Sequence, residues 1–238
     1  MNFDNIIIGG GLAGLLAGIR LQRAGQDCAL ISTGQSAMHF WSGAFDLLNR
    51  LPDGTEVDYP LEGMQKLPAT HPYSVIGPEK VLDYLRSAVE TFGSFGCRTH
   101  IPEELCNIFR LSTMGSLKRC FLTMDDLLTT SSPEEPLCRR ALVANLDGFL
   151  DFNTEFIAKG LEDSGSPCRT VTIRLEALKK LRRSPTEMRS TNISRILDRP
   201  TFKEYVSQIR KNMTGKTSSC CRPYSVSQTQ EMPSNSER

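Results

Sequence analysis

Hydrophobic residues at the start of the chain change their spacing twice within about thirty positions, the length of a βαβ unit. Isoleucines fill positions 6–8 as a β-branched run bounded by glycine, which is typical of a buried strand. Leucines and isoleucines at 12–19 then recur at helical spacing, and a second apolar run follows at 28–31. This order predicts a strand, a helix and a second strand.

Three glycines occupy the predicted turn between the first strand and the helix. Gly9, Gly11 and Gly14 have the spacing G-x-G-x-x-G, in which the first permits a sharp turn, the second lets backbone approach a pyrophosphate, and the third lets the helix pack closely on the strand. Unpaired N–H groups at the helix start, around Leu12 and Ala13, suit an anionic phosphate. Glycine-rich turns are common, so a βαβ unit without a ligand is the alternative.

The second predicted strand lacks the acidic residue that holds an adenosine ribose in many dinucleotide-binding proteins. Ser32 and Thr33 stand at that point. A hydroxyl cannot accept the bidentate pair of hydrogen bonds that a carboxylate accepts. This weakens an interpretation as an independent NAD-binding oxidoreductase.

Residues 33–48 combine glycine with small hydrogen-bonding side chains. This composition predicts a loop around a phosphate or a flavin, or else an ordinary polar loop leading into a helix that starts near Asp46. His39 could bond a phosphate or tune a flavin ring, or could be incidental. The candidate loop residues are Gln35, Ser36, His39, Ser42 and Gly43.

Further along, apolar spacing and turn residues predict an alternation of elements. A helix is expected from 78 to about 93, strands within 98–101 and 109–123, a turn at 133–136, a strand at 141–146, a helix at 151–161 and a strand at 171–175. The fold class is α/β, a Rossmann-like FAD/NAD(P)-binding fold with an inserted α+β layer. We divide it into a βαβ unit with its loop at 1–60, the insertion at 61–140 and a continuation at 141–212.

Composition excludes several classes of protein. With 28 Lys and Arg against 27 Asp and Glu, no global charge favours nucleic acid. The apolar run at 6–19 is shorter than the ~20 residues of a membrane span, and no basic residue precedes it as in a signal peptide. The 8 cysteines form no C-x-x-C pair, so no metal site is expected. A cytoplasmic protein without a transmembrane segment is expected.

Several segments together resemble one family. FDNIIIGGGLAGLLAGIRLQRAG at 3–25, TGQSAMHFWSGAFDLLNRLPDG at 33–54 and THPYSVI at 70–76 occur in the order and at the intervals seen in the B subunit of anaerobic glycerol-3-phosphate dehydrogenase. LSTMGSLKRCFLT at 111–123 is similar to a later family segment but departs from it at Met114, Gly115, Ser116, Cys120 and Phe121. ALVANLDGFLDFNTEFIAKGL at 141–161 and RSTNISRILDRP at 189–200 also look related.

The resemblance implies a flavin-dependent electron-transfer subunit. In that family a catalytic A subunit oxidises glycerol 3-phosphate to dihydroxyacetone phosphate, and a membrane-associated iron–sulfur C subunit passes electrons to quinone. The complex would lie at the inner face of the cell membrane. FMN is the cofactor usually assigned to the B subunit, and Ser32 agrees with a mononucleotide, whereas the glycine turn by itself suits FAD. Because the resemblance places substrate oxidation on the A subunit, we name no catalytic residue in this chain.

The resemblance covers about residues 2–210, which is half of the family's length. A later segment that closes the flavin site in such proteins is not found, so we expect a fold incomplete at the C-terminus. Residues 213–238 contain almost no large apolar side chains, which predicts disorder. A premature stop or shifted reading frame would give such a tail, and the alternative function is a truncated, flavin-free remnant.

Overall fold

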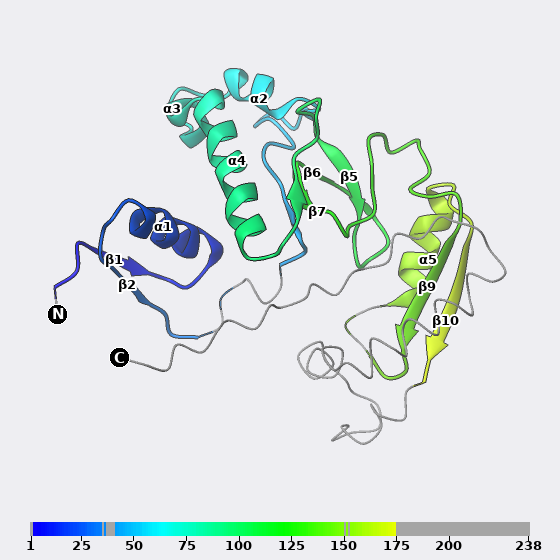
Figure 1. Cartoon of the computed structure of the whole chain (residues 1–238). Helices are drawn as coiled ribbons and strands as arrows, with labels where there is room; N and C mark the ends of the chain where they lie inside the picture. The colour runs from blue at the N-terminus through cyan, green and yellow to red at the C-terminus, as the bar shows by residue number, and fades with distance from the viewer. Residues whose placement is uncertain (1, 35, 37–40, 150, 152, 175–238) are drawn as a thin grey trace.

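The computed structural model describes residues 2–34, 36, 41–149, 151 and 153–174 (Figure 1). Its N-terminal part consists of β1 (Asn5–Ile8), α1 (Leu12–Arg23) and β2 (Cys28–Ile31). The two strands pair in parallel, with Asn5 opposite Cys28 and Ile8 opposite Ile31. The predicted βαβ unit is therefore present.

Helix α1 packs against one face of this two-stranded sheet by means of glycines. A Cβ atom on Gly14 would lie 3.2 Å from Ile7 Cγ2, and one on Gly18 would lie 3.0 Å from Ile7 Cδ1. Bare glycines thus let the helix lie directly on Ile7. Even so, no residue of β1, α1 or β2 is fully buried, so the unit has no core of its own.

Two arginines connect α1 to α4 (Pro78–Ser94), and Figure 1 shows the two helices side by side. Arg23 Nη1 donates a hydrogen bond to Thr91 Oγ1 at 3.0 Å. The guanidinium carbon of Arg20 lies 4.7 Å from the centre of the Tyr84 ring. The βαβ unit is therefore attached by polar and cation–π contacts in addition to its covalent connection.

The middle of the chain forms short helices and antiparallel strands. The 3₁₀ helix η2 (Met64–Lys66) lies between α2 (Pro60–Gly63) and α3 (Pro72–Ile76), ahead of α4. A buried cluster supports these helices; it contains Leu48, Val57, Met64, Leu67 and Val81. Two antiparallel sheets have the orders β3 (Ala44–Phe45), β7 (Leu122–Met124), β4 (Thr99–His100), and β6 (Leu117–Cys120), β5 (Ile108–Leu111), β8 (Thr129–Thr130).

Strands β4 to β7 occupy the two ranges in which strands were predicted, whereas β3 and β8 lie outside them. The helix considered near Asp46 is not formed. The backbone there is extended instead. Asn49 O accepts the N–H of Val57 at 3.0 Å, and the Leu51 N–H donates to Thr55 O at 2.9 Å. This pairing across a turn brings Leu48 and Val57 into the same buried cluster. Tertiary burial thus outweighs the local preference for a helix.

A second parallel unit consists of β9 (Ala141–Leu146), α5 (Thr154–Asp163) and β10 (Cys168–Ile173). The helix begins at Thr154 rather than at 151, because Asn153 Oδ1 caps it by accepting the N–H groups of Glu155 and Phe156 at 3.0 and 3.1 Å. β10 begins earlier than predicted because Cys168 already pairs with Ala141.

The described strands of the two parallel units form separate sheets, β1 with β2 and β9 with β10. The description of the antiparallel strands as an insertion, and the divisions at 60, 140 and 212, stay predictions. The tail at 213–238 lies outside the described residues.

Candidate functional site

The turn after β1 has a backbone that requires glycine at its first position. Gly9 has φ +106°, a region that side-chain-bearing residues rarely adopt, and its N–H donates to Ile31 O at 2.8 Å. This bond fixes the turn to the end of β2. The structural reason predicted for Gly9 is confirmed.

Gly14 and Gly11 are bare for different reasons. A Cβ atom on Gly14 would overlap the carbonyl oxygen of Gly9, so helix and turn touch through backbone alone. A Cβ atom on Gly11 would meet nothing within 4 Å, and Gly11 has φ −75°, which any residue tolerates. Packing within the protein therefore explains Gly14 but not Gly11. The space beside Gly11 is open to a group from outside the chain.

The first turn of α1 contains no acidic residue and has no side-chain cap. Gly11 is the N-cap residue and, as a glycine, has no side chain that could accept a hydrogen bond from the first N–H groups. The first N–H groups of any helix lack partners within the helix, and the helix dipole adds a partial positive charge there. Leu12 and Ala13 belong to this first turn. An anionic group of a ligand would be stabilised at this position.

Ser32 lies beside the glycine turn. A Cβ atom on Gly10 would come within 2.9 Å of Ser32 Oγ, which shows how closely the two approach. The Ser32 hydroxyl donates to Gly34 O at 3.0 Å, and both Ser32 and Thr33 are exposed. The hydroxyl therefore has a bond within its own loop.

The candidate flavin loop is described only in part. Gln35 and His39 lie outside the described residues, Ser36 is half-buried and Ser42 is exposed. Gly43 has φ +79° and accepts the Met124 N–H at 2.8 Å, so it has a structural role at the β3–β7 junction whether or not a cofactor binds.

Trp41 fixes the end of this loop to α4. Its ring is stacked on Phe92 with centroids 5.7 Å apart and lies 4.9 Å from Phe45, and its indole N–H donates to Ala44 O at 3.1 Å. Phe92 is the neighbour of Thr91, which accepts the bond from Arg23. Adjacent residues of α4 thus hold both the end of α1 and the end of the loop. The sequence interpretation did not single out Trp41.

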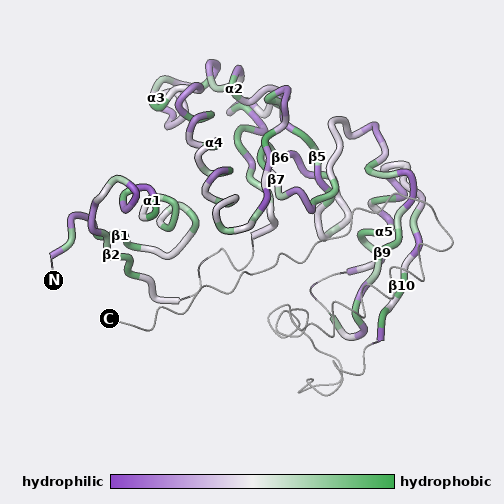
Figure 2. The backbone as a smooth tube through the Cα atoms, in the orientation of Figure 1, coloured by the Kyte–Doolittle hydropathy of each residue, from purple (hydrophilic) through white to green (hydrophobic). Residues whose placement is uncertain are grey.

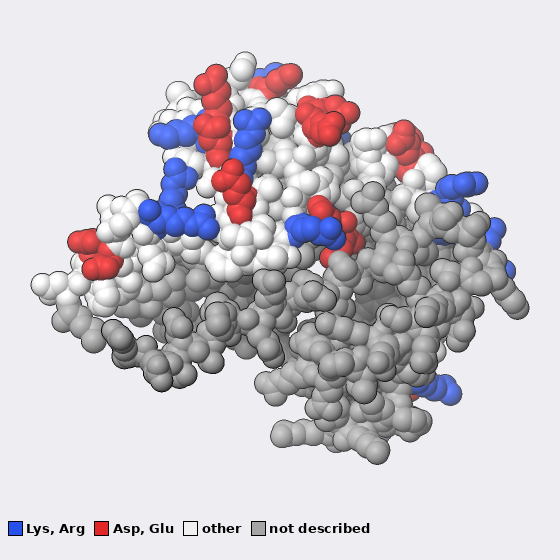
Figure 3. All heavy atoms as spheres, viewed as in Figure 1, with Lys and Arg blue, Asp and Glu red and all other residues white. Residues whose placement is uncertain are grey.

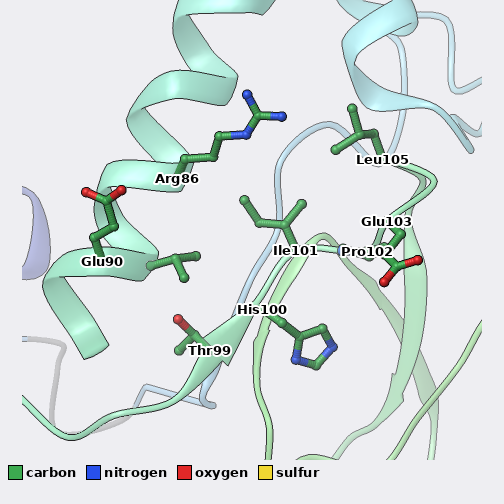
Figure 4. A pocket seen from close by; sticks show the side chains of 9 residues that line it. Arg86, Glu90, Thr99, His100, Ile101, Pro102, Glu103 and Leu105 are labelled. Carbon is green, nitrogen blue, oxygen red and sulfur yellow. The ribbon is translucent and has the colours of Figure 1, made fainter. Parts of the chain in front are cut away.

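A hollow of about 500 Å³ lies elsewhere, between α4 and the segment after β4 (Figure 4). Arg86, Glu90, Thr99, Ile101 and Glu103 are among its lining residues, and no predicted site residue lines it. His100 also lines it, and its Nδ1 lies 2.9 Å from Asp125 Oδ1. His100 and Asp125 are 25 positions apart, and no local sequence pattern predicts that they lie together.

The remaining chemistry of the described residues is modest. No group of three or more His, Cys, Asp or Glu side chains in the described ranges could hold a metal ion. Burial raises the pKa of the Cys120 thiol to about 12, so that it stays protonated. Basic and acidic side chains alternate over the face shown in Figure 3. No helix within the described part is long and apolar enough to cross a membrane.

Known proteins resemble this chain as follows. The family described as FAD binding domain matches residues 4–222. The B subunit of anaerobic glycerol-3-phosphate dehydrogenase from Pectobacterium carotovorum is 39% identical over 211 residues, covering 84% of this chain and 48% of the relative. Its counterpart in Yersinia pestis is 40% identical over 208 residues with the same coverage, and that of Pasteurella multocida is 32% identical over 223 residues, covering 90% and 52%. No solved structure matches significantly.

These relatives confirm the family resemblance identified from the motifs. The family match also implies a Rossmann-like FAD-binding α/β fold, to which the parallel unit with its glycine turn conforms. The chain spans about half the length of the curated relatives it matches.

Proposed function

The chain belongs to the FAD binding domain family, and from this premise we propose that it is the flavin-dependent electron-transfer subunit of an anaerobic glycerol-3-phosphate dehydrogenase. The observation that carries the proposal is the open space at Gly11, next to a helix whose first turn has no acidic residue and no side-chain cap. Relatives named as the B subunit of that enzyme support the choice of reaction.

In this proposal the glycine turn holds the phosphate of the flavin. Gly11 gives the phosphate access to backbone, and the N–H groups of Leu12 and Ala13 donate to its oxygens. Gly9 and Gly14 keep turn and helix in place. Ser32 and Thr33 lie at the end of β2, where a ribose hydroxyl could bond them. The isoalloxazine ring supplies the redox chemistry, while the protein supplies position and electrostatics.

FAD is the cofactor to test first, because the family is described by it. The FMN assignment expected from the sequence rests on Ser32 and the resemblance, and has no specific support from the family match. Ser36, Ser42 and Gly43, together with Gln35 and His39, which lie outside the described residues, are proposed to flank the flavin.

The reaction and the partners belong to the same proposal. Glycerol 3-phosphate would be oxidised to dihydroxyacetone phosphate on a catalytic A subunit, and electrons would pass through the flavin to an iron–sulfur C subunit and then to quinone. The complex would work on the cytoplasmic face of the membrane during anaerobic respiration. In this proposal the chain would transfer electrons, and the catalytic A subunit would oxidise the substrate.

Visible absorbance of the purified protein tests the proposal. A flavin band at one equivalent per chain is expected, and mass analysis of the extracted cofactor distinguishes FAD from FMN. A folded, colourless protein that takes up neither flavin would instead support the flavin-free remnant. Tight binding of NADH without flavin would support an independent NAD-binding oxidoreductase.

A further inference from the structure

One face of the antiparallel sheet β6–β5–β8 carries a row of polar side chains. Arg110 on β5 pairs with Lys118 on β6 and with Thr129 on β8. Directly paired residues of neighbouring strands share a face of the sheet, so these three side chains lie on the same face. Figure 2 shows hydrophilic as well as hydrophobic positions along β5 and β6. We call Arg110, Lys118 and Thr129 the cationic row.

The same face is buried next to the cationic row. Ile108 and Cys120 pair two positions away along the strands, so they share the face, and they form a buried cluster with Ala44. Asp46 follows Ala44 by two residues. Burial raises the pKa of the Asp46 carboxyl, and the two cations of the row oppose this rise because they lie near it. The cationic row therefore adjoins the segment that follows the proposed flavin loop.

Arg110 has no anionic partner among the described residues. It is half-buried, its Nε atom is buried without a hydrogen-bond acceptor, and no ion pair joins its guanidinium to another described residue. Arg119, on the opposite face of the sheet, has both Glu56 and Asp58 as partners. A half-buried cation that lies opposite a second cation and lacks an anion is unfavourable. An anion from outside the described residues would remove this cost.

We propose that the cationic row binds a phosphate group of a small ligand. The planar Arg110 guanidinium can donate two parallel hydrogen bonds to two phosphate oxygens. Lys118 on one side and Thr129 on the other can donate to the third oxygen. A carboxylate fits less well, because its two oxygens would be satisfied by the guanidinium alone.

Charge also favours a phosphate. A phosphate ester carries a charge of about −1.5 to −2 at neutral pH, close to that of two cations. The two cations outweigh the single carboxylate of Asp46, so the site keeps a positive charge when it is empty of ligand. This inference goes beyond the proposed function, in which the glycine turn holds the flavin phosphate, and does not depend on which flavin binds.

Calorimetric titration of the full, flavin-free chain with inorganic phosphate at constant ionic strength tests the site. Saturable binding is expected. Arg110→Gln should weaken it at least about 10-fold, since hydrogen bonds to a charged group are lost. Lys118→Gln should weaken it by up to about 5-fold, because Lys118 is exposed. Lys80→Gln is the matched control: Lys80 is exposed on α4 rather than on this sheet, and its loss should leave the dissociation constant unchanged.

Gly11→Ala separates this inference from the proposed function. Phosphate bound at the glycine turn would be lost in Gly11→Ala, whereas phosphate bound at the cationic row would be lost in Arg110→Gln. Binding that depends on Arg110 is expected even if the chain takes up no flavin. No binding by the wild type, or binding that Arg110→Gln leaves unchanged, would overturn the inference.

Two further results would also overturn it. Equal weakening by Lys80→Gln would show only a general effect of charge. Acetate binding as tightly as phosphate would instead favour an acidic side chain of a protein partner as the occupant. Thermal unfolding of each variant checks folding. Arg110→Lys, which keeps the charge but loses the paired donors, replaces Arg110→Gln if that variant unfolds, and should still bind phosphate more weakly than the wild type.

Discussion

Alanine at Gly11 and at Gly14 should have opposite consequences, although both belong to the same G-x-G-x-x-G turn. At Gly14 the new methyl group would overlap the carbonyl oxygen of Gly9, which is backbone and cannot turn away, and would lie 3.2 Å from Ile7 Cγ2. Overpacking of this kind costs about 1–3 kcal/mol. The higher helix propensity of alanine offsets about 1 kcal/mol of this cost. Because the overlap is with backbone, the upper end of the overpacking cost applies, and Gly14→Ala should destabilise the chain by about 2 kcal/mol, about 3 less about 1.

At Gly11 the methyl group enters open space, and φ of −75° suits alanine. Glycine is a better N-cap residue than alanine, so Gly11→Ala should lower the free energy of unfolding by about 0.5–1 kcal/mol, less than Gly14→Ala does. The same methyl group would keep a phosphate from the N–H groups of the first turn. Each hydrogen bond to a charged group contributes about 1.5–3 kcal/mol, so the loss of one weakens binding about 10- to 150-fold.

Urea unfolding and titration of the flavin-free protein with FAD measure the two quantities on each variant. Gly11→Ala is expected to lose less stability than Gly14→Ala and to bind FAD weakly. Wild-type FAD affinity in Gly11→Ala would refute the phosphate cradle. Wild-type stability in Gly14→Ala would refute the packing on which the cradle rests.

Three further changes test other contacts by equilibrium unfolding. Trp41→Ala should lower the free energy of unfolding by about 2–3 kcal/mol through loss of the stack on Phe92, less than the about 3–5 kcal/mol of a fully buried tryptophan because Trp41 is half-buried. Trp41→Phe, which keeps an aromatic ring there, should cost less than about 1.5 kcal/mol. Gly160→Ala would put a methyl group onto the carbonyl oxygen of Gly115 and should lower the free energy of unfolding by about 2 kcal/mol. Gly93→Ala is the control: its methyl group would meet nothing within 4 Å, so this change should be neutral or stabilising. Burial raises the pKa of the Asp46 carboxyl above 3.8, so ionisation of Asp46 at neutral pH opposes folding. Asp46→Asn should therefore raise the free energy of unfolding at pH 7. This gain should vanish as the pH falls below 3.8, where Asp46 is protonated in both the folded and the unfolded chain. A gain independent of pH would contradict this assignment.

The elements that the sequence predicted well are those with a clear period. The β1–α1–β2 unit and α4 have apolar residues at strand or helix spacing and end near glycine. The short elements α2, α3, β3 and β8 were not predicted, because two to five residues are too few for a period. α5 was predicted three residues too long at its start, because the capping role of Asn153 was not recognised.

The candidate site was predictable where local geometry decides it. Gly9 and Gly14 have the structural roles that the motif implies. Gly43 fits the motif of a flavin loop equally well, but its position at the β3–β7 junction gives it a separate structural reason. The stack of Trp41 on Phe92 joins positions 51 residues apart, and no local sequence pattern predicts such a contact.

The glycine turn also explains why the βαβ unit depends on its surroundings. Bare glycines let α1 approach Ile7, but they remove the side chains that would otherwise build a core between helix and sheet. The unit is then stabilised by the Arg20 and Arg23 contacts and by whatever binds its exposed surfaces. In the proposed function, a ligand at Gly11 would bind the folded unit in preference to the unfolded one and would stabilise it by mass action. Cofactor binding at the proposed site would thus be thermodynamically coupled to folding of the unit, because the ligand would favour the folded arrangement of β1, α1 and β2.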